Sequence, residues 1–205
     1  MDTRLKHPFT CIVAGPTGCG KTTFVTRLLQ HASSFIDPPP EKVVWCYGEW
    51  QHLYGTIPEV RFVDGLPDES LFNSKTKNLV IIDDLMTETD GRVTNLFTKK
   101  SHHCNTSVVY LVQSMFPKNK ESRTISLNAQ YIVAFKNPRD ATQVTHLARQ
   151  MYPGRVKYMQ EAFKDATSSP YGYLLIDLKQ ETPEHLRLRT NVFPDEVQYT
   201  YLPKT

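Results

Sequence analysis

The chain has 205 residues, of which 40% are hydrophobic and 11% aromatic, and its 24 Lys and Arg against 21 Asp and Glu give a formal net charge of +3. A chain of this length can bury one substantial core, and the aromatic content argues against a disordered protein. We therefore expect a single domain over residues 1–205, with a core at about 7–178 and an irregular C-terminal tail at about 179–205.

Membrane and disulfide-bonded classes of protein are disfavoured by simple patterns. No run approaches the roughly 20 apolar residues of a membrane span, so we expect no membrane insertion. The first eight residues are polar and lack the apolar core of a signal peptide. The four cysteines are scattered without a CxxC pair, which excludes a zinc ribbon and disfavours a disulfide scaffold. We expect a reduced, intracellular protein.

The predicted elements alternate between apolar strands and helices. Strands are predicted, in chain order, at 9–14, 42–47, 78–83, 106–112, 130–135 and 171–178, with a further short one at 60–63. Helices are predicted at 21–31, 93–101, 140–151 and 156–166, residues 67–70 resemble a helix start, and Asp140 is the candidate N-cap of the third helix. This alternation is typical of a parallel sheet that helices cover on both faces.

The first predicted strand leads into a glycine-rich motif. Residues 15–22, Gly-Pro-Thr-Gly-Cys-Gly-Lys-Thr, match GxxxxGK[ST] and precede a predicted helix. Glycines let backbone N–H groups converge on phosphate oxygens, and the helix N-terminus adds partial positive charge. We expect Lys21 to reach the β- and γ-phosphates of ATP and the Thr22 hydroxyl to bind Mg²⁺. The predicted nucleotide-binding residues are Gly15, Pro16, Thr17, Gly18, Cys19, Gly20, Lys21, Thr22 and Thr23.

Two carboxylates end the strand predicted at 78–83. In a nucleotide-binding parallel sheet the strand C-termini face the ligand, so Asp83 is expected to hold Mg²⁺, directly or through water. Asp84 is the candidate base that orients or deprotonates the attacking water. A second acid beside the metal-binding acid favours hydrolysis over transfer to a substrate hydroxyl.

An amide ends the strand predicted at 106–112. The strand predicted at 9–14 is the phosphate-loop strand, and the one at 78–83 is the acidic strand. If the strand at 106–112 lies between them, Gln113 comes near the γ-phosphate. There its amide can donate to a phosphate oxygen and accept from the attacking water. The patterns together predict an α/β fold of the P-loop NTPase class. We expect the ASCE, RecA-like form, a three-layer sandwich with a mainly parallel central sheet.

These motifs, together with Tyr-Ile-Val-Ala-Phe-Lys-Asn-Pro-Arg-Asp at 131–140, resemble the FtsK–HerA superfamily over about residues 7–155. The likeness is to its viral genome-packaging ATPases of the poxvirus-like and Polinton/Maverick or adintovirus-like kind. The resemblance implies a homo-oligomeric ring, a hexamer or a pentamer, that threads double-stranded DNA into a preformed capsid at its vertex. It also implies a virus-infected host cell, or the virion, as the location, with ATP bound between subunits.

Ring ATPases complete their site with an arginine from the next subunit. The candidates are Arg123, Arg92 and Arg139, of which we favour Arg123 in an outward-facing loop. DNA contacts are expected from two basic clusters, since backbone phosphates suffice for translocation on any sequence. The clusters are Lys99-Lys100-Ser101-His102-His103 and Lys118, Lys120 and Arg123.

Some alternatives remain open. A small P-loop kinase that phosphorylates a nucleoside or metabolite would carry the same loop, although no Arg-rich lid is evident. A nucleotide-dependent switch would too, although Lys118-Asn119-Lys120-Glu121 does not match a guanine signature. The aromatic residues Trp45, Tyr47, Trp50 and Tyr54 could contact adenine or a neighbouring subunit, and core packing is the favoured interpretation.

Overall fold

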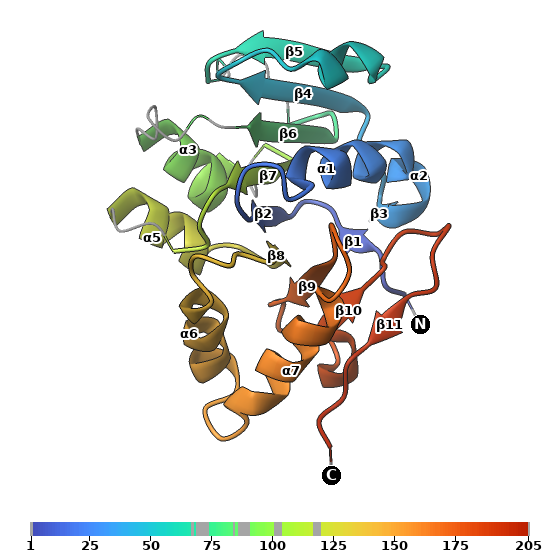
Figure 1. The fold of residues 1–205 in the computed structure, drawn as a ribbon. Helices are drawn as coiled ribbons and strands as arrows, with labels where there is room; N and C mark the ends of the chain where they lie inside the picture. The colour runs from blue at the N-terminus through green and yellow to red at the C-terminus, as the bar shows by residue number, and fades with distance from the viewer. Residues whose placement is uncertain are drawn as a thin grey trace.

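The computed structural model describes residues 2–66, 68, 74–83, 85, 91–100, 104–116 and 120–204. Nine strands form one sheet: β2 (Thr10–Ala14), β4 (Lys42–Tyr47), β5 (Val60–Asp64), β6 (Asn78–Asp83), β7 (Thr106–Val112), β8 (Tyr131–Phe135), β9 (Tyr173–Asp177), β10 (Leu188–Thr190) and β11 (Tyr199–Thr200). Their spatial order is β11-β10-β9-β8-β2-β7-β6-β4-β5 (Figure 1). A separate parallel pair joins β1 (Leu5–Lys6) to β3 (Ile36–Asp37).

The centre of the sheet is parallel and the end nearest the C-terminus is antiparallel. Strand β2 pairs in parallel with both β7 and β8, and β7 also pairs in parallel with β6. Strands β9, β10 and β11 continue the sheet antiparallel from β8. Strand β7 therefore lies between the phosphate-loop strand β2 and the acidic strand β6, which is the condition on which the expected position of Gln113 depends. The sheet is that of an α/β P-loop NTPase.

Helices cover both faces of the sheet (Figure 1). One face carries α1 (Lys21–Gln30), α2 (Ala32–Phe35) and the 3-10 turn η1 (His52–Thr56), whose apolar side chains share one core cluster. The other carries α3 (Gly91–Asn95), the π-helical turn η4 (Leu96–Lys100), α5 (Lys120–Leu127), α6 (Thr142–Met151) and α7 (Val156–Ala166), which share the second cluster. The strands between are continuously apolar because both of their faces are buried.

Most predicted elements are confirmed within one or two residues, and the differences are local. The helix expected at 93–101 is α3 followed by η4, and α5 occupies part of the segment expected as an outward loop. The expected helix start at 67–70 lies largely outside the described residues. No helix in the described part of the chain is long and apolar enough to cross a membrane.

The expected irregular tail contributes to the core. Besides β10 and β11, it holds the 3-10 turn η5 (Glu184–Leu186), and Leu188, Val192 and Phe193 are buried. The Arg27 guanidinium on α1 forms ion pairs with Asp195 and Glu196 at 2.8 and 2.6 Å. The prediction of an irregular tail is therefore wrong for these residues, because their apolar side chains cover the sheet and α1.

Candidate nucleotide site at the carboxyl edge of the sheet

The phosphate loop joins the end of β2 to the start of α1. The Gly15 N–H donates to the Val112 carbonyl of β7 at 3.1 Å, which ties the start of the loop to the sheet. Gly18 and Gly20 have φ of +78° and +107°, a region that disfavours side chains. A Cβ on Gly15 would lie 2.6 Å from Cys19 Sγ and 2.7 Å from Phe135 Cβ. The loop conformation therefore requires the glycines of the motif.

The electrostatics of the loop suit an anion. Helix α1 has no acidic residue in its first turn, so its N-terminal partial positive charge is not offset there. The Lys21 Nζ donates to the Gly15 and Pro16 carbonyls at 2.7 and 3.1 Å, and its ammonium group therefore lies across the loop itself. Backbone amides, a helix terminus and an ammonium group together can bind phosphate oxygens.

A pocket of about 300 Å³ opens beside the loop. It is lined by Thr17, Gly18, Gly20, Lys21, Thr22, Thr23, Gln51, Leu53, Asp83, Leu111, Val112, Gln113 and Tyr171. Four residues that the sequence predicted from three separate motifs therefore line one cavity: Lys21 and Thr22, Asp83, and Gln113. The carboxyl ends of parallel strands bring them together.

Asp83 is held in place by a residue that the sequence did not single out for this task. Its side chain ends β6, is only 4% exposed, and its Oδ2 accepts a hydrogen bond from the Tyr54 hydroxyl at 2.8 Å. The Tyr54 ring is buried against Trp45, with ring centroids 5.1 Å apart. Core packing is thus confirmed for Trp45 and Tyr54. The one feature of the sequence that could have indicated the contact with Asp83 is the hydroxyl of Tyr54, because a tyrosine whose ring is buried needs a hydrogen-bond partner.

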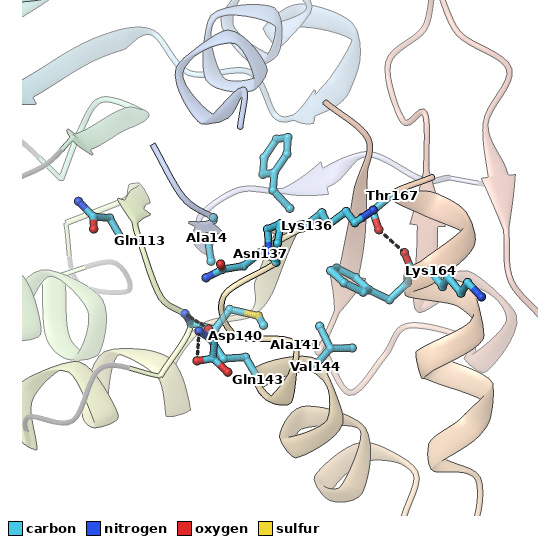
Figure 2. A pocket seen from close by; sticks show the side chains of 15 residues that line it. Ala14, Gln113, Lys136, Asn137, Asp140, Ala141, Gln143, Val144, Lys164 and Thr167 are labelled. Carbon is cyan, nitrogen blue, oxygen red and sulfur yellow. Dashed lines mark hydrogen bonds between the residues drawn. The ribbon is translucent and has the colours of Figure 1, made fainter. Parts of the chain in front are cut away.

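Gln113 follows β7 directly and is exposed between two cavities. It lines the nucleotide pocket and a second pocket of about 190 Å³ on the α6 and α7 side of the sheet. Figure 2 shows the second pocket, with Gln113 and Ala14 on one side and Lys164 and Thr167 on the other. The Gln113 amide can therefore contact a ligand bound at the phosphate loop. It can also respond to movement of the residues that line the second pocket, on the α6 and α7 side of the sheet.

The chain after Gln113 is fixed by a side-chain network that sequence reasoning missed. Buried Gln143 of α6 accepts the Met115 N–H at 2.7 Å through Oε1 and donates to Asp140 Oδ2 at 2.7 Å through Nε2 (Figure 2). Ser126 of α5 donates its hydroxyl to the Met115 carbonyl at 2.8 Å. Both backbone groups of Met115, two residues beyond Gln113, are thus bonded to helices.

The prediction that Asp140 is the N-cap of α6 is wrong, because the N-cap residue is Ala141; Asp140 instead contacts the first residue of the helix from one position earlier. Its Oδ1 accepts the Thr142 N–H at 3.3 Å and the Thr142 hydroxyl at 2.6 Å, and α6 begins at Thr142 rather than at Asp140. Hydrogen bonds from Thr142 and Gln143 lower the pKa of the Asp140 carboxyl below its ordinary value. The charged carboxylate therefore helps to hold Gln143.

The remaining predicted residues are not brought into the pocket by the described part of the chain. Arg123 is exposed on α5, which is a helix where a loop was expected. It lines neither the nucleotide pocket nor the second pocket. The Arg139 N–H donates to Asn137 Oδ1 at 3.1 Å. Asp84, the residues at 101–103 and 118, and the side chains of Lys99, Lys100 and Lys120 lie outside the described residues.

The chemistry of the site fits Mg²⁺. Thr22 and Asp83 offer hard oxygen ligands in one pocket, and Mg²⁺ keeps several waters and phosphate oxygens rather than requiring a full protein cage. In the described residues no group of three or more His, Cys, Asp or Glu is placed to hold a metal ion. The hydroxyl and carboxylate together with a nucleotide are therefore the donor set available here.

Two solved structures with a similar fold are of one viral protein. The genome packaging NTPase B204 from Sulfolobus turreted icosahedral virus 2, in complex with ATP-gammaS, matches over 100% of both chains with a TM-score of 0.54 and 11% identity. The same protein in complex with AMPPCP matches over 100% of both chains with a TM-score of 0.53 and 9% identity. At such identities the likeness concerns the fold. A search of curated protein sequences finds no significant match.

A family model gives the assignment at the level of sequence. The model described as the viral superfamily 1 RNA helicase core domain matches residues 11–197, from within β2 to beyond β10. The matched region contains the phosphate loop, Asp83 and Gln113. The chain is a P-loop NTPase and belongs to the viral superfamily 1 RNA helicase core domain family.

Proposed function

We propose that the protein is a Mg²⁺-dependent ATPase that drives double-stranded DNA into a viral capsid. The observation that carries the ATPase part is the pocket in which most of the phosphate-loop motif, including Lys21, meets Asp83 and Gln113 at the ends of neighbouring strands. The packaging part is supported by the full-length fold likeness to a genome packaging NTPase and by the motif resemblance to the FtsK–HerA superfamily. Membership of the poxvirus-like or Polinton-like lineage stays a prediction.

Binding of ATP is assigned to the loop and to Lys21. Loop amides and the α1 N-terminus hold the phosphates, and the Lys21 ammonium leaves the Gly15 and Pro16 carbonyls to neutralise charge on the β- and γ-phosphates. Thr22 and Asp83 would hold Mg²⁺, which supplies positive charge at the transferring phosphoryl group. The hydroxyl of Tyr54 keeps the Asp83 carboxylate facing the pocket.

Hydrolysis requires an activated and aligned water. We assign the base to Asp84, next to Asp83 in sequence and outside the described residues. We assign alignment of that water, and detection of the γ-phosphate, to the Gln113 amide. Such groups act by positioning and by electrostatic stabilisation, which dominate phosphoryl transfer.

Assembly and location follow from the packaging hypothesis. The exposed position of Arg123 on α5 leaves it accessible to a neighbouring subunit, so we retain it as the arginine donated in trans within a homo-oligomeric ring. The ring would be a hexamer or a pentamer at the capsid vertex, with Lys99, Lys100, Lys118 and Lys120 contacting DNA phosphates. The infected host cell, or the virion, would be its location.

The test follows both ATP hydrolysis and movement on nucleic acid. Long double-stranded DNA is expected to stimulate hydrolysis, and the protein is expected to displace a third strand from a triplex track without separating the duplex beneath. Hydrolysis that responds to no polynucleotide would contradict the proposal. Phosphate transfer to an added nucleoside would instead indicate the small-kinase alternative.

The family assignment favours one second candidate, a nucleic-acid helicase. The matching model is described as an RNA helicase core and covers most of the chain. A helicase would hydrolyse ATP in the same pocket but would be stimulated by single-stranded RNA. Strand separation of a tailed RNA duplex, without third-strand displacement from DNA, would select this function over packaging.

A further inference from the structure

The loop between α7 and β9 presents an exposed aromatic ring at the phosphate loop. Tyr171 is 71% exposed, which is unusual for a large ring, and its φ of +62° lies in the left-handed region that a residue with a Cβ seldom adopts. Neither feature helps the core. Exposure and backbone strain at one residue are typical of a functional position.

The surrounding turn keeps Tyr171 in this position. The Thr167 hydroxyl donates to the Phe163 carbonyl at 2.7 Å, and the Gly172 N–H donates to the Ser169 carbonyl at 3.1 Å. A Cβ on Gly172 would lie 2.5 Å from the Ala166 carbonyl oxygen, so the turn is tight. The ring is therefore presented by a fixed loop, which reduces the entropy lost when a ligand contacts it.

The ring lies at one end of the nucleotide pocket. A Cβ built on Gly20 would be 3.3 Å from Tyr171 Cδ1, and Tyr171 lines the pocket together with Thr22 and Thr23. Strand order separates the two ends: Asp83 and Gln113 follow β6 and β7 on one side of β2, whereas Tyr171 precedes β9 on the β8 side. A γ-phosphate facing Asp83 and Gln113 directs the base toward Tyr171.

We propose that Tyr171 stacks on the base of the bound nucleoside triphosphate. The inference rests on the proposed ATPase function and names the residue that holds the non-phosphate end of its substrate. Stacking on an aromatic ring stabilises any base because each has a π-face. The aromatic cluster around Trp45 is not needed for this task, since Tyr54 of that cluster contacts Asp83 at the opposite end.

The experiment measures binding of ATP and of inorganic tripolyphosphate by titration calorimetry. Tyr171→Asn removes the ring and substitutes a residue that tolerates a positive φ, Tyr171→Phe keeps the ring, and Tyr199→Asn removes an exposed ring on β11 as the control. From the usual contribution of a base stack, Tyr171→Asn should weaken ATP binding about 5- to 150-fold. Tyr171→Phe and Tyr199→Asn should bind ATP as the wild type does, and all variants should bind tripolyphosphate equally.

Two results would overturn the assignment of Tyr171. Either Tyr171→Asn binds ATP with wild-type affinity, or it loses tripolyphosphate affinity to the same degree as ATP affinity. Failure of the proposed function is distinguishable, because then the wild type itself binds neither ATP nor tripolyphosphate. Thermal melting of each variant checks that the fold is retained.

Discussion

Lys21 is a single side chain that contacts the phosphate loop itself and is also the proposed partner of the phosphates. Its ammonium group is hydrogen-bonded to the Gly15 and Pro16 carbonyls, inside the loop that the glycines shape. A phosphate that enters the loop offers stronger, charge-assisted hydrogen bonds than these neutral carbonyls. The lysine can therefore exchange partners without a change in the loop backbone.

Lys21→Ala should abolish this electrostatic contribution. We expect kcat for ATP hydrolysis to fall by at least about 10²- to 10³-fold, the usual effect of removing one preorganised donor at a transition-state oxyanion. Steady-state phosphate release measures the change. Lys157→Ala on α7, where the side chain is 87% exposed, is the matched control. Near-normal turnover in Lys21→Ala would refute the assignment of the phosphate loop.

Tyr54→Phe tests the support of Asp83, the proposed ligand of Mg²⁺. Loss of the hydroxyl removes the hydrogen bond to Asp83 Oδ2 while the ring still packs on Trp45. Loss of such an outer contact typically lowers metal affinity about 10- to 100-fold, so we expect a similar rise in the Mg²⁺ concentration needed for half-maximal hydrolysis. Tyr47→Phe in the same cluster is the control. An unchanged Mg²⁺ requirement would count against Asp83 as the metal ligand.

At the scale of elements, the site depends on strand order and on how the loops after β7 and β8 are joined. The parallel pairing of β2, β7 and β6 brings the phosphate loop, Gln113 and Asp83 to one edge. Gln143 of α6 then bonds the chain beyond Gln113 to the segment after β8. Movement of α6 would therefore shift the segment that follows Gln113. In this way the position of α6 is coupled to the nucleotide pocket.

Gln143→Met should separate catalysis from binding. The substitution preserves volume but leaves the buried Met115 N–H without its acceptor, which costs about 1–3 kcal/mol and lowers the melting temperature of a chain this size by about 2–12 °C. We expect kcat to fall about tenfold or more while KM for ATP stays within twofold, because the phosphate loop is untouched. Gln150→Met, exposed on the same helix, is the control. A loss of stability with kcat unchanged would show that Gln143 is only structural.

Periodicity and motif spacing predicted the elements that are long or strongly apolar. Strands β4, β6 and β7 agree with prediction to the residue, and the glycine motif predicted the loop. Sequence reasoning missed Gln143 because its partner Met115 is 28 positions away and nothing in the polar pattern of α6 marks it as buried. It missed α5 because a polar, basic segment resembles a loop when its packing partners are unknown.

At the scale of the whole molecule, the C-terminal segment packs against α1, the helix that follows the phosphate loop, and against α2. The centroid of the Phe193 ring lies 5.1 Å from that of Phe24 of α1 and 5.4 Å from that of Phe35 of α2. The Arg27 guanidinium carbon lies over the Phe193 ring, 4.4 Å from its centroid. The sequence predicted an irregular tail here, because the burial of this segment depends on helices more than 150 positions earlier in the chain. The helix that bears the phosphate loop is thus stabilised by the end of the chain.

Phe193→Ala tests this long-range packing. Truncating a fully buried phenylalanine typically costs about 3–5 kcal/mol, which should lower the melting temperature by about 6–20 °C. Differential scanning calorimetry measures the shift. Val197→Ala, at a side chain that is 71% exposed in the same segment, should change the melting temperature by no more than about 2 °C. Equal melting of the two variants would show that the segment does not stabilise α1.

The measurement that tests the central claim most directly is ATP hydrolysis across a protein concentration series, with and without long double-stranded DNA and with no small-molecule acceptor. A ring motor with shared sites predicts turnover per subunit that rises with protein concentration and rises further with DNA. Turnover that is indifferent to both, or that requires an added nucleoside, would contradict a DNA-translocating ATPase.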